Sequence, residues 1–120
     1  MSYEEGLAVT GAERIAAERR RQIEQEGYSV EHDLAMPYED GALVFAAICY
    51  ATPQAQRSMV RLPKMGSEPF PVAWPWTSET WKGCPDQNPS IEDRIRELEK
   101  AGALIAAEID RLIAIQEEQR

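Results

Sequence analysis

The chain has few of the side chains on which most enzyme and metal sites depend. It contains two cysteines, Cys49 and Cys84, and a single histidine, His32. Two thiols provide neither a disulfide framework nor the paired cysteines of a zinc site. The motifs of P-loop nucleotidases, zinc proteases and serine hydrolases are also missing. The sequence therefore argues against the common forms of nucleophilic and zinc catalysis.

Long apolar runs and basic clusters are also scarce. The longest apolar stretch, residues 42–51, is too short to span a bilayer. The first residues lack the basic and apolar regions of a signal peptide, so we expect a cytoplasmic protein with reduced cysteines and no membrane contact. The net charge of −8 argues against direct binding of nucleic acid, which depends on clustered Lys and Arg.

A length of 120 residues with 43% hydrophobic residues predicts one domain with a modest core. We expect residues 1–9 to form a flexible tail and residues 10–120 to form the domain. Within it, seven of the eight prolines lie in residues 53–89. This segment is therefore predicted to be a long crossover between helices.

The first and last helices are the most clearly marked. Thr10 and Glu13 have the spacing of a capping box, and Gly27 stands where a left-handed residue would end the helix, which predicts a helix over residues 11–26. Ser90, followed by Asp93, marks the start of a helix over residues 91–117. Its apolar residues recur at alternating steps of four and three, the spacing of a helix seam: Ile91, Ile95, Leu98, Gly102, Ile105, Ile109 and Leu112. We expect this stripe to pack closely against another helix, of this chain or of a second copy.

A third helix is predicted over residues 37–51, with Pro37 in its first turn. From Ala42 to Ala51 it is apolar on every face, so we expect it to be buried on all sides. Three helices leave one of its faces hard to cover, which indicates a partner subunit. The predicted fold is all-α, with three main helices, a Pro/Trp-rich crossover, and assembly as a homodimer or higher homo-oligomer.

The candidate binding residues are aromatic and basic. Trp74, Trp76 and Trp81 all lie in the crossover, where they would either pack onto the helices as a lid or bind a ligand base or a partner protein. Arg19 and Arg20 belong to a short basic run that would either meet phosphate or pair with neighbouring acids.

Three further groups of residues are candidates for chemistry. The run Glu31-His32-Asp33 would bind a metal or move a proton, unless it is an ordinary loop. Cys84 is a weak nucleophile candidate. Carboxylates on facing helices hold Mg²⁺; Glu39 and Asp40 are the best placed for this, and Glu97 would be a further ligand.

Four blocks of the sequence resemble small accessory proteins of tailed phages and prophages. These blocks are E-R-R-R-Q-I-E-Q-E-G-Y (18–28), G-A-L-V-F-A-A-I-C-Y-A (41–51), W-P-W to W-K (74–82) and L-E-K-A-G-A-L-I-A-A-E-I-D-R-L (98–112). The resemblance implies a phage early-region protein that acts in the host cytoplasm. It brings no catalytic residues with it.

The chain is also similar, less extensively, to all-α nucleotide pyrophosphohydrolases of the MazG-like kind. Some of these open with an E-R-x-R-Q-I helix and bind Mg²⁺ through E-x-x-E and E-x-x-D pairs. Here Glu39 is followed three residues later by Ala42, and Glu97 by Lys100, so two of the acids are missing. The resemblance supports the helical architecture and puts hydrolysis in doubt.

Two main hypotheses about function follow, beside a third option, a plain oligomeric structural protein, which would explain the last helix without either activity. The first is a non-enzymatic accessory protein without a cofactor, which binds a host factor or sequesters a small nucleotide-like ligand through Arg19, Arg20 and the three tryptophans. The alternative is a Mg²⁺-dependent nucleoside triphosphate pyrophosphohydrolase that uses Glu39, Asp40 and Glu97, assisted by His32 or Glu31.

Overall fold

The computed structural model describes residues 10–54, 56, 74–76, 78–84 and 88–120. Over these residues the protein is helical and contains no β-strand, which confirms the all-α prediction. The helices are α1 (Gly11–Glu26), α2 (Val30–Ala35), α3 (Ala42–Ala51) and α4 (Ile91–Glu118), with single 3₁₀ turns η1 (Tyr38–Asp40) and η3 (Ser78–Thr80). The expected tail (1–9) and most of the crossover lie outside the described residues.

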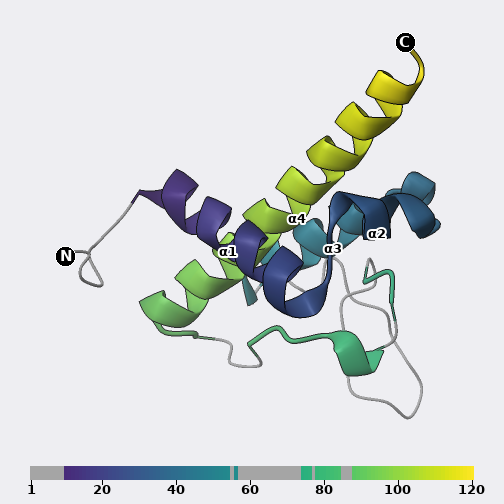
Figure 1. Cartoon of the computed structure of the whole chain (residues 1–120). Helices are drawn as coiled ribbons and strands as arrows, with labels where there is room; N and C mark the ends of the chain where they lie inside the picture. Colours follow the sequence, from purple (N-terminus) through teal and green to yellow (C-terminus); the bar gives the residue numbers. More distant parts are fainter. Residues whose placement is uncertain (1–9, 55, 57–73, 77, 85–87) are drawn as a thin grey trace.

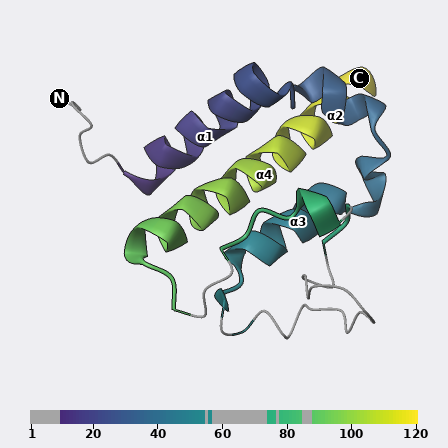
Figure 2. The same cartoon turned by 90° about the horizontal axis from the view of Figure 1, so that it is seen from below.

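Helix α4 is the centre of the fold. It packs against α1 on one side and α3 on the other, and α2 contacts it near its C-terminal half (Figures 1 and 2). Arg94, in the first turn of α4, donates hydrogen bonds to the carbonyl oxygens of Tyr50 (3.0 Å) and Ala51, at the end of α3. These bonds satisfy carbonyls that a helix end leaves unpaired, and so they fix the register of α3 on α4.

The ends of α1 agree with the sequence prediction. The Thr10 backbone N–H donates to the Glu13 carboxylate at 2.9 Å, and the Glu13 N–H donates to the Thr10 hydroxyl at 3.2 Å. Gly27 ends the helix with φ 76°, and its N–H is bonded to the last turn. The capping box and the left-handed glycine are therefore both confirmed. Helix α4 also begins as predicted, because the Ser90 hydroxyl accepts a hydrogen bond from the Asp93 backbone N–H at 3.0 Å.

Replacing Gly27 with Ala should lower the free energy of unfolding by about 1 kcal/mol. A Cβ at φ 76° clashes with its own backbone, although the space around Gly27 is open. The matched control is Gly11→Ala, which also adds a Cβ in open space but at an ordinary helical φ. Urea unfolding of both variants checks this, and an equal effect of the two would contradict the role given to Gly27.

The segment between α1 and α3 differs from the prediction. Residues 28–36 contain α2, whose first turn is capped by the Ser29 hydroxyl at 3.1 Å from the His32 N–H. The predicted start at Pro37 was wrong, because α3 begins at Ala42. Gly41 adopts φ 91°, which closes η1 and breaks the helical path before α3. Only glycine takes this conformation without strain.

Helix α3 is buried on one side only within the chain. Its buried residues are Ala42, Leu43, Ala46, Ala47, Cys49 and Tyr50. Val44, Phe45 and Ile48 remain 40–45% exposed. The prediction that α3 is buried on all sides rested on its apolar sequence. It is wrong for the single chain, because these three side chains remain partly exposed.

The predicted seam of α4 also lies on the exposed side of the chain. Apart from Gly102, whose Cα packs against Ile15 of α1, its members are 39–80% exposed. The buried side of α4 instead combines small and charged residues: Glu97, Ala101, Ala103, Leu104, Ala107 and Arg111. The alanines let α1 and α3 approach closely. Glu97 accepts hydrogen bonds from Gln54 and the Cys84 backbone N–H, and Arg111 pairs with Glu108 one turn earlier on α4.

Candidate functional site

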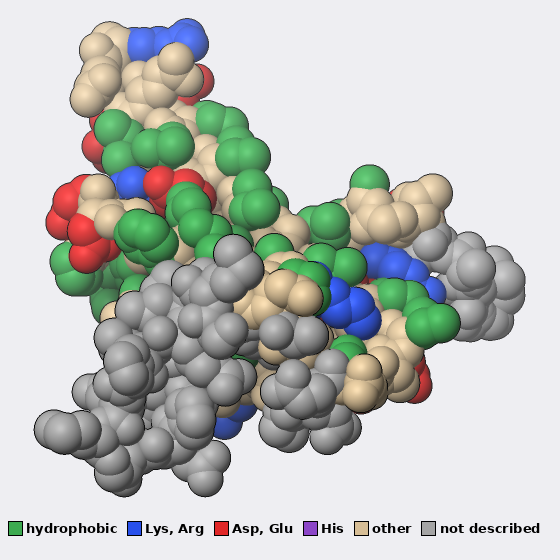
Figure 3. Space-filling model, turned by 180° about the vertical axis from the view of Figure 1, so that it is seen from behind, with side chains coloured by type: hydrophobic (Ala, Val, Ile, Leu, Met, Phe, Trp, Pro, Cys, Tyr) green, Lys and Arg blue, Asp and Glu red, His purple; other side chains and the backbone are tan. Residues whose placement is uncertain are grey.

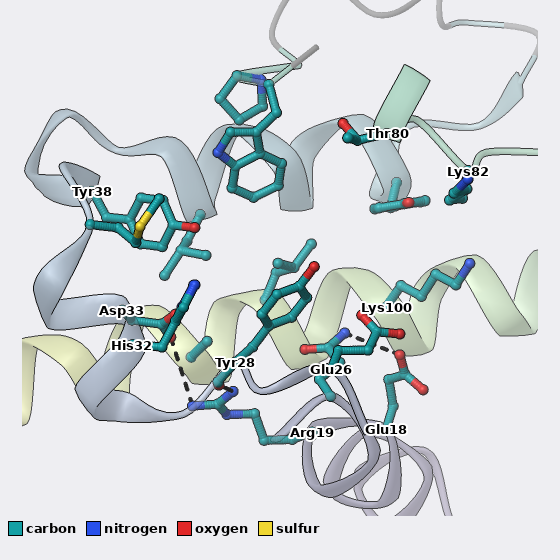
Figure 4. A pocket seen from close by; sticks show the side chains of 18 of the residues that line it. Glu18, Arg19, Glu26, Tyr28, His32, Asp33, Tyr38, Thr80, Lys82 and Lys100 are labelled. Atoms are coloured by element: carbon teal, nitrogen blue, oxygen red, sulfur yellow. Dashed lines mark hydrogen bonds and ion pairs between the residues drawn. The ribbon is translucent and has the colours of Figure 1, made fainter. Parts of the chain in front are cut away.

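A cavity of about 940 Å³ opens between α1, α2, α3 and α4 and is roofed by the Trp segment, which we define as residues 74–76 and 78–84. This volume is typical of sites for small ligands. Figure 4 shows its walls, with α3 on one side and α1 and α4 on the other. Its aromatic lining consists of Tyr28, His32, Tyr38, Tyr50, Trp74 and Trp76.

The aromatic rings form a connected series around the cavity. Tyr28 and His32 have centroids 5.4 Å apart, and His32 lies 6.3 Å from Tyr38. Tyr38 continues to Trp76 at 5.9 Å, and Trp76 to Trp74 at 5.2 Å in an edge-to-face contact. Such ring contacts stabilise one another, so the wall is held in place before any ligand binds.

At one end of the cavity, His32 and Asp33 form a hydrogen-bonded pair. His32 Nδ1 and Asp33 Oδ1 are 2.9 Å apart, and the Asp33 side chain is only 2% exposed. This bond fixes the orientation of the imidazole, whose Nε2 is then the nitrogen available to a ligand. Among the described residues, the second carboxylate oxygen of Asp33 accepts no hydrogen bond, and Arg19 Nη2 lies 4.0 Å from it.

Arg19 has a structural role beneath this end of the cavity. Its side chain is 9% exposed and donates to the Tyr28 carbonyl at 2.8 Å and to Asp110 at 3.4 Å. It therefore ties α1 to α2 and α4 while balancing the charge of Asp33. Arg20, by contrast, is exposed and does not line the cavity. Of the two predicted arginines, one supports the site and the other lies outside it.

The other end of the cavity contains a buried acid. Glu18 accepts hydrogen bonds from Arg21 (2.9 Å), Gln22 (3.0 Å) and Arg96 (2.7 Å), and its side chain is 3% exposed. Burial alone would raise the pKa of Glu18, but the hydrogen bonds from Arg21 and Arg96 outweigh it and lower the pKa to about 2. Glu18 is therefore a permanent negative charge whose hydrogen-bonding capacity is used within the protein.

Lys100 reaches into the same end of the cavity from α4. Figure 4 shows Lys100 and Glu18 on the side formed by α1 and α4, and Lys82 on the facing side. Its ammonium lies 5.4 Å from the centre of the Tyr50 ring, and among the described residues no carboxylate is within ion-pair distance. Burial lowers the pKa of Lys100, and the positive charge of Arg96 adds to the effect. An anion bound here would oppose both effects.

The three tryptophans differ in whether they pack against other side chains or line the cavity. Trp74 is 93% buried, donates its indole N–H to Thr80 at 3.0 Å, and also lines the cavity. Trp76 is half-buried and lines the cavity. Trp81 stacks on Tyr50 with a centroid distance of 4.8 Å and is not among the lining residues. Trp81 therefore packs against Tyr50, whereas Trp76 lines the cavity, and ligand binding by Trp76 stays a prediction.

The acids considered for Mg²⁺ do not come together. Glu39 and Asp40 are exposed in η1, and the charge of Glu39 acts on Arg111. Glu97 lies fourteen residues, or about 21 Å, before Arg111 on α4. Its carboxylate accepts from Gln54 at 2.6 Å and from the Cys84 backbone N–H at 2.7 Å. In the part of the chain that the structure describes, no group of three or more His, Cys, Asp or Glu side chains is arranged to hold a metal ion.

Several site residues were missed by sequence reasoning. Tyr28, Tyr38 and Tyr50 lie in separate segments, and only the fold brings them to one cavity. Lys100 was not among the predicted site residues. A signal did exist: Glu97, Lys100, Leu104 and Arg111 recur at helical spacing, which marks a second, polar stripe.

Comparison of the chain with protein-family models, with curated proteins and with solved structures found no significant match. The described helices include none that is both long enough and apolar enough to cross a membrane.

Proposed function

We propose that the protein binds, and thereby sequesters, a small nucleotide-like ligand in this cavity. The observation that carries the proposal is the position of Lys100, a half-buried cation without a carboxylate partner among the described residues, in a cavity with aromatic walls. Such a cavity suits a molecule with a flat ring at one end and an anionic group at the other.

The ring would occupy the end formed by Tyr28, His32, Tyr38 and Trp76. Aromatic side chains stack on the flat face of any nucleotide base. His32 Nε2 would hydrogen-bond an edge of the ring, because its Nδ1 is already bonded to Asp33. The ring contacts between these side chains keep the wall in place, so little ordering is needed on binding.

The anionic group would occupy the end near Lys100 and Lys82. The protein carries a net charge of −8, yet the described residues that line the cavity include equal numbers of Lys or Arg and of Asp or Glu. Arg19 and Arg21 are engaged by Asp33, Glu18 and Glu26. The lysines are therefore the cations that remain for a phosphate, which binds lysine as a point charge.

The acids considered for Mg²⁺, Glu39, Asp40 and Glu97, lie apart in the described part of the fold, so the geometry favours the binding hypothesis over the alternative. The resemblance to phage accessory proteins brings no catalytic residues with it. Capture of a nucleotide-like signal in the cytoplasm of a host cell fits both considerations.

Isothermal titration calorimetry with nucleoside monophosphates and cyclic nucleotides tests the proposal. We expect at least one of them to bind, and Lys100→Ala to weaken its binding about tenfold or more, since a charge-assisted hydrogen bond contributes about 1.5–3 kcal/mol. The matched control is Arg20→Ala, which removes the same charge from an exposed position outside the cavity. Absence of binding at millimolar nucleotide, or equal effects of the two variants, would refute the proposal.

A further inference from the structure

The side of the molecule away from the cavity carries a second unexplained feature, an uncharged surface of large apolar side chains. We call it the apolar face and define it by seven residues of α3 and α4 that are 39–51% exposed: Phe45, Ile48, Ile95, Leu98, Ile105, Ile109 and Leu112. Figure 3 shows hydrophobic side chains in a row along α4.

The helix geometry places the apolar face opposite the cavity. Residues two or five positions apart point to nearly opposite sides of an α-helix. On α4, Leu98 and Ile105 are two and five residues from Lys100, which lines the cavity. On α3, Phe45 and Ile48 have the same relation to Leu43, another lining residue. Both helices therefore turn these apolar side chains away from the ligand site.

The apolar face is large for an exposed patch. Its members span residues 95–112 of α4, about 27 Å, and residues 45–48 of α3, about 6 Å, and each helix presents a strip about 10 Å wide. This gives roughly 330 Å² of apolar surface per copy, which is the size of the largest apolar patch on a typical folded chain. Patches of this size often have a function.

We infer that a second copy of this chain covers the apolar face, which makes the protein a homodimer. The stripe on α4 has the alternating four- and three-residue spacing by which one helix packs into an identical helix. The seven residues of the apolar face include no charge, and permanent homodimer interfaces are more apolar than the surfaces used by transient partners. Between two chains that each carry a charge of −8, contact is least opposed at an uncharged surface.

This dimer would leave both cavities open on its outer sides, since the interface and the cavity use opposite sides of α3 and α4. Each particle would then bind two ligands independently. The dimer can be tested independently of the proposed ligand, because the evidence for the dimer comes from a different surface.

Sedimentation equilibrium of the full chain, at micromolar concentration, tests the dimer. We expect the mass of two chains for the wild type and of one chain for Ile105→Asp, because a carboxylate at the centre of the apolar face would be buried without a partner. Gln25→Asp, which adds the same charge on an exposed position of α1, should remain dimeric. A wild type with the mass of one chain, or an Ile105→Asp variant that keeps the mass of two, would overturn the inference.

If Ile105→Asp fails to fold, a benzophenone amino acid in place of Ile105 provides the decisive measurement. Irradiation should yield covalently linked pairs of chains in high proportion. The same photoreactive residue in place of Gln25 should yield almost none. Equal crosslinking from the two positions would show that the apolar face is not the interface.

Discussion

Replacing Glu18 with Gln should lower the free energy of unfolding at pH 7 by about 3 kcal/mol. The carboxylate is almost fully buried and accepts hydrogen bonds from Arg21, Gln22 and Arg96, and an amide of the same shape satisfies only part of this set. Breaking a buried ionic network of this kind costs about 3–5 kcal/mol. The difference between the ordinary pKa of 4.5 and the folded pKa of about 2 corresponds to about 3 kcal/mol.

The pH dependence distinguishes this ionic effect from a loss of packing. Because the pKa of Glu18 is lower in the folded state, its contribution is fully present above pH 4.5 and is lost as the pH falls toward 2. The stability difference between wild type and Glu18→Gln should therefore be largest near neutral pH and shrink steadily below about pH 4.5. Urea unfolding at several pH values measures it.

Glu24→Gln is the matched control, since Glu24 is an exposed acid on the same helix. Its effect should stay within about 0.5 kcal/mol at every pH. A Glu18→Gln variant that is as stable as this control at pH 7, or whose deficit is the same at pH 3 and pH 7, would contradict the network described for Glu18.

Replacing Glu97 with Ala should detach the Trp segment from α4. The carboxylate holds both ends of the crossover, through Gln54 near its start and the Cys84 backbone N–H near its end. Its loss removes two charge-assisted hydrogen bonds, which should cost about 3 kcal/mol of unfolding free energy. Trp74 and Trp76 would lose their support, so the cavity would lose its roof.

Tryptophan fluorescence reports this change directly. We expect the emission maximum of Glu97→Ala to shift to longer wavelength in the native protein, since indoles that are now buried or half-buried would meet water. Glu118→Ala, which removes an exposed acid at the end of the same helix, should keep the wild-type spectrum. An unshifted spectrum in Glu97→Ala would mean that Glu97 does not hold the Trp segment.

The sequence predicted those parts of the fold that depend on local signals. The bounds of α1 and the start of α4 follow from capping residues whose hydrogen bonds lie within one turn, such as Thr10 with Glu13. The start of α3 was missed because Gly41 takes a left-handed conformation that no neighbouring residue signals. The side on which α4 is buried was also missed, because apolar spacing alone does not distinguish a core from an interface.

The cavity was harder to predict than the helices. Trp74 and Trp76 were identified because three tryptophans in one short segment are unusual. Arg20 was included because it neighbours Arg19, yet on a helix adjacent residues point in different directions. Lys100 was overlooked because its role depends on burial beside Tyr50, which lies fifty residues earlier in the chain.

The most direct test of the central claim is the response of the three indole N–H signals in a ¹⁵N–¹H spectrum during titration with nucleoside monophosphates and cyclic nucleotides. Single Trp→Phe variants assign the signals. If the cavity binds one of these ligands, the Trp76 signal should shift strongly and saturably, the Trp81 signal should stay nearly fixed, and Lys100→Ala should move the titration to higher ligand concentration. If no indole signal shifts at millimolar ligand, or if Trp81 responds as strongly as Trp76, the cavity is not the ligand site that we propose.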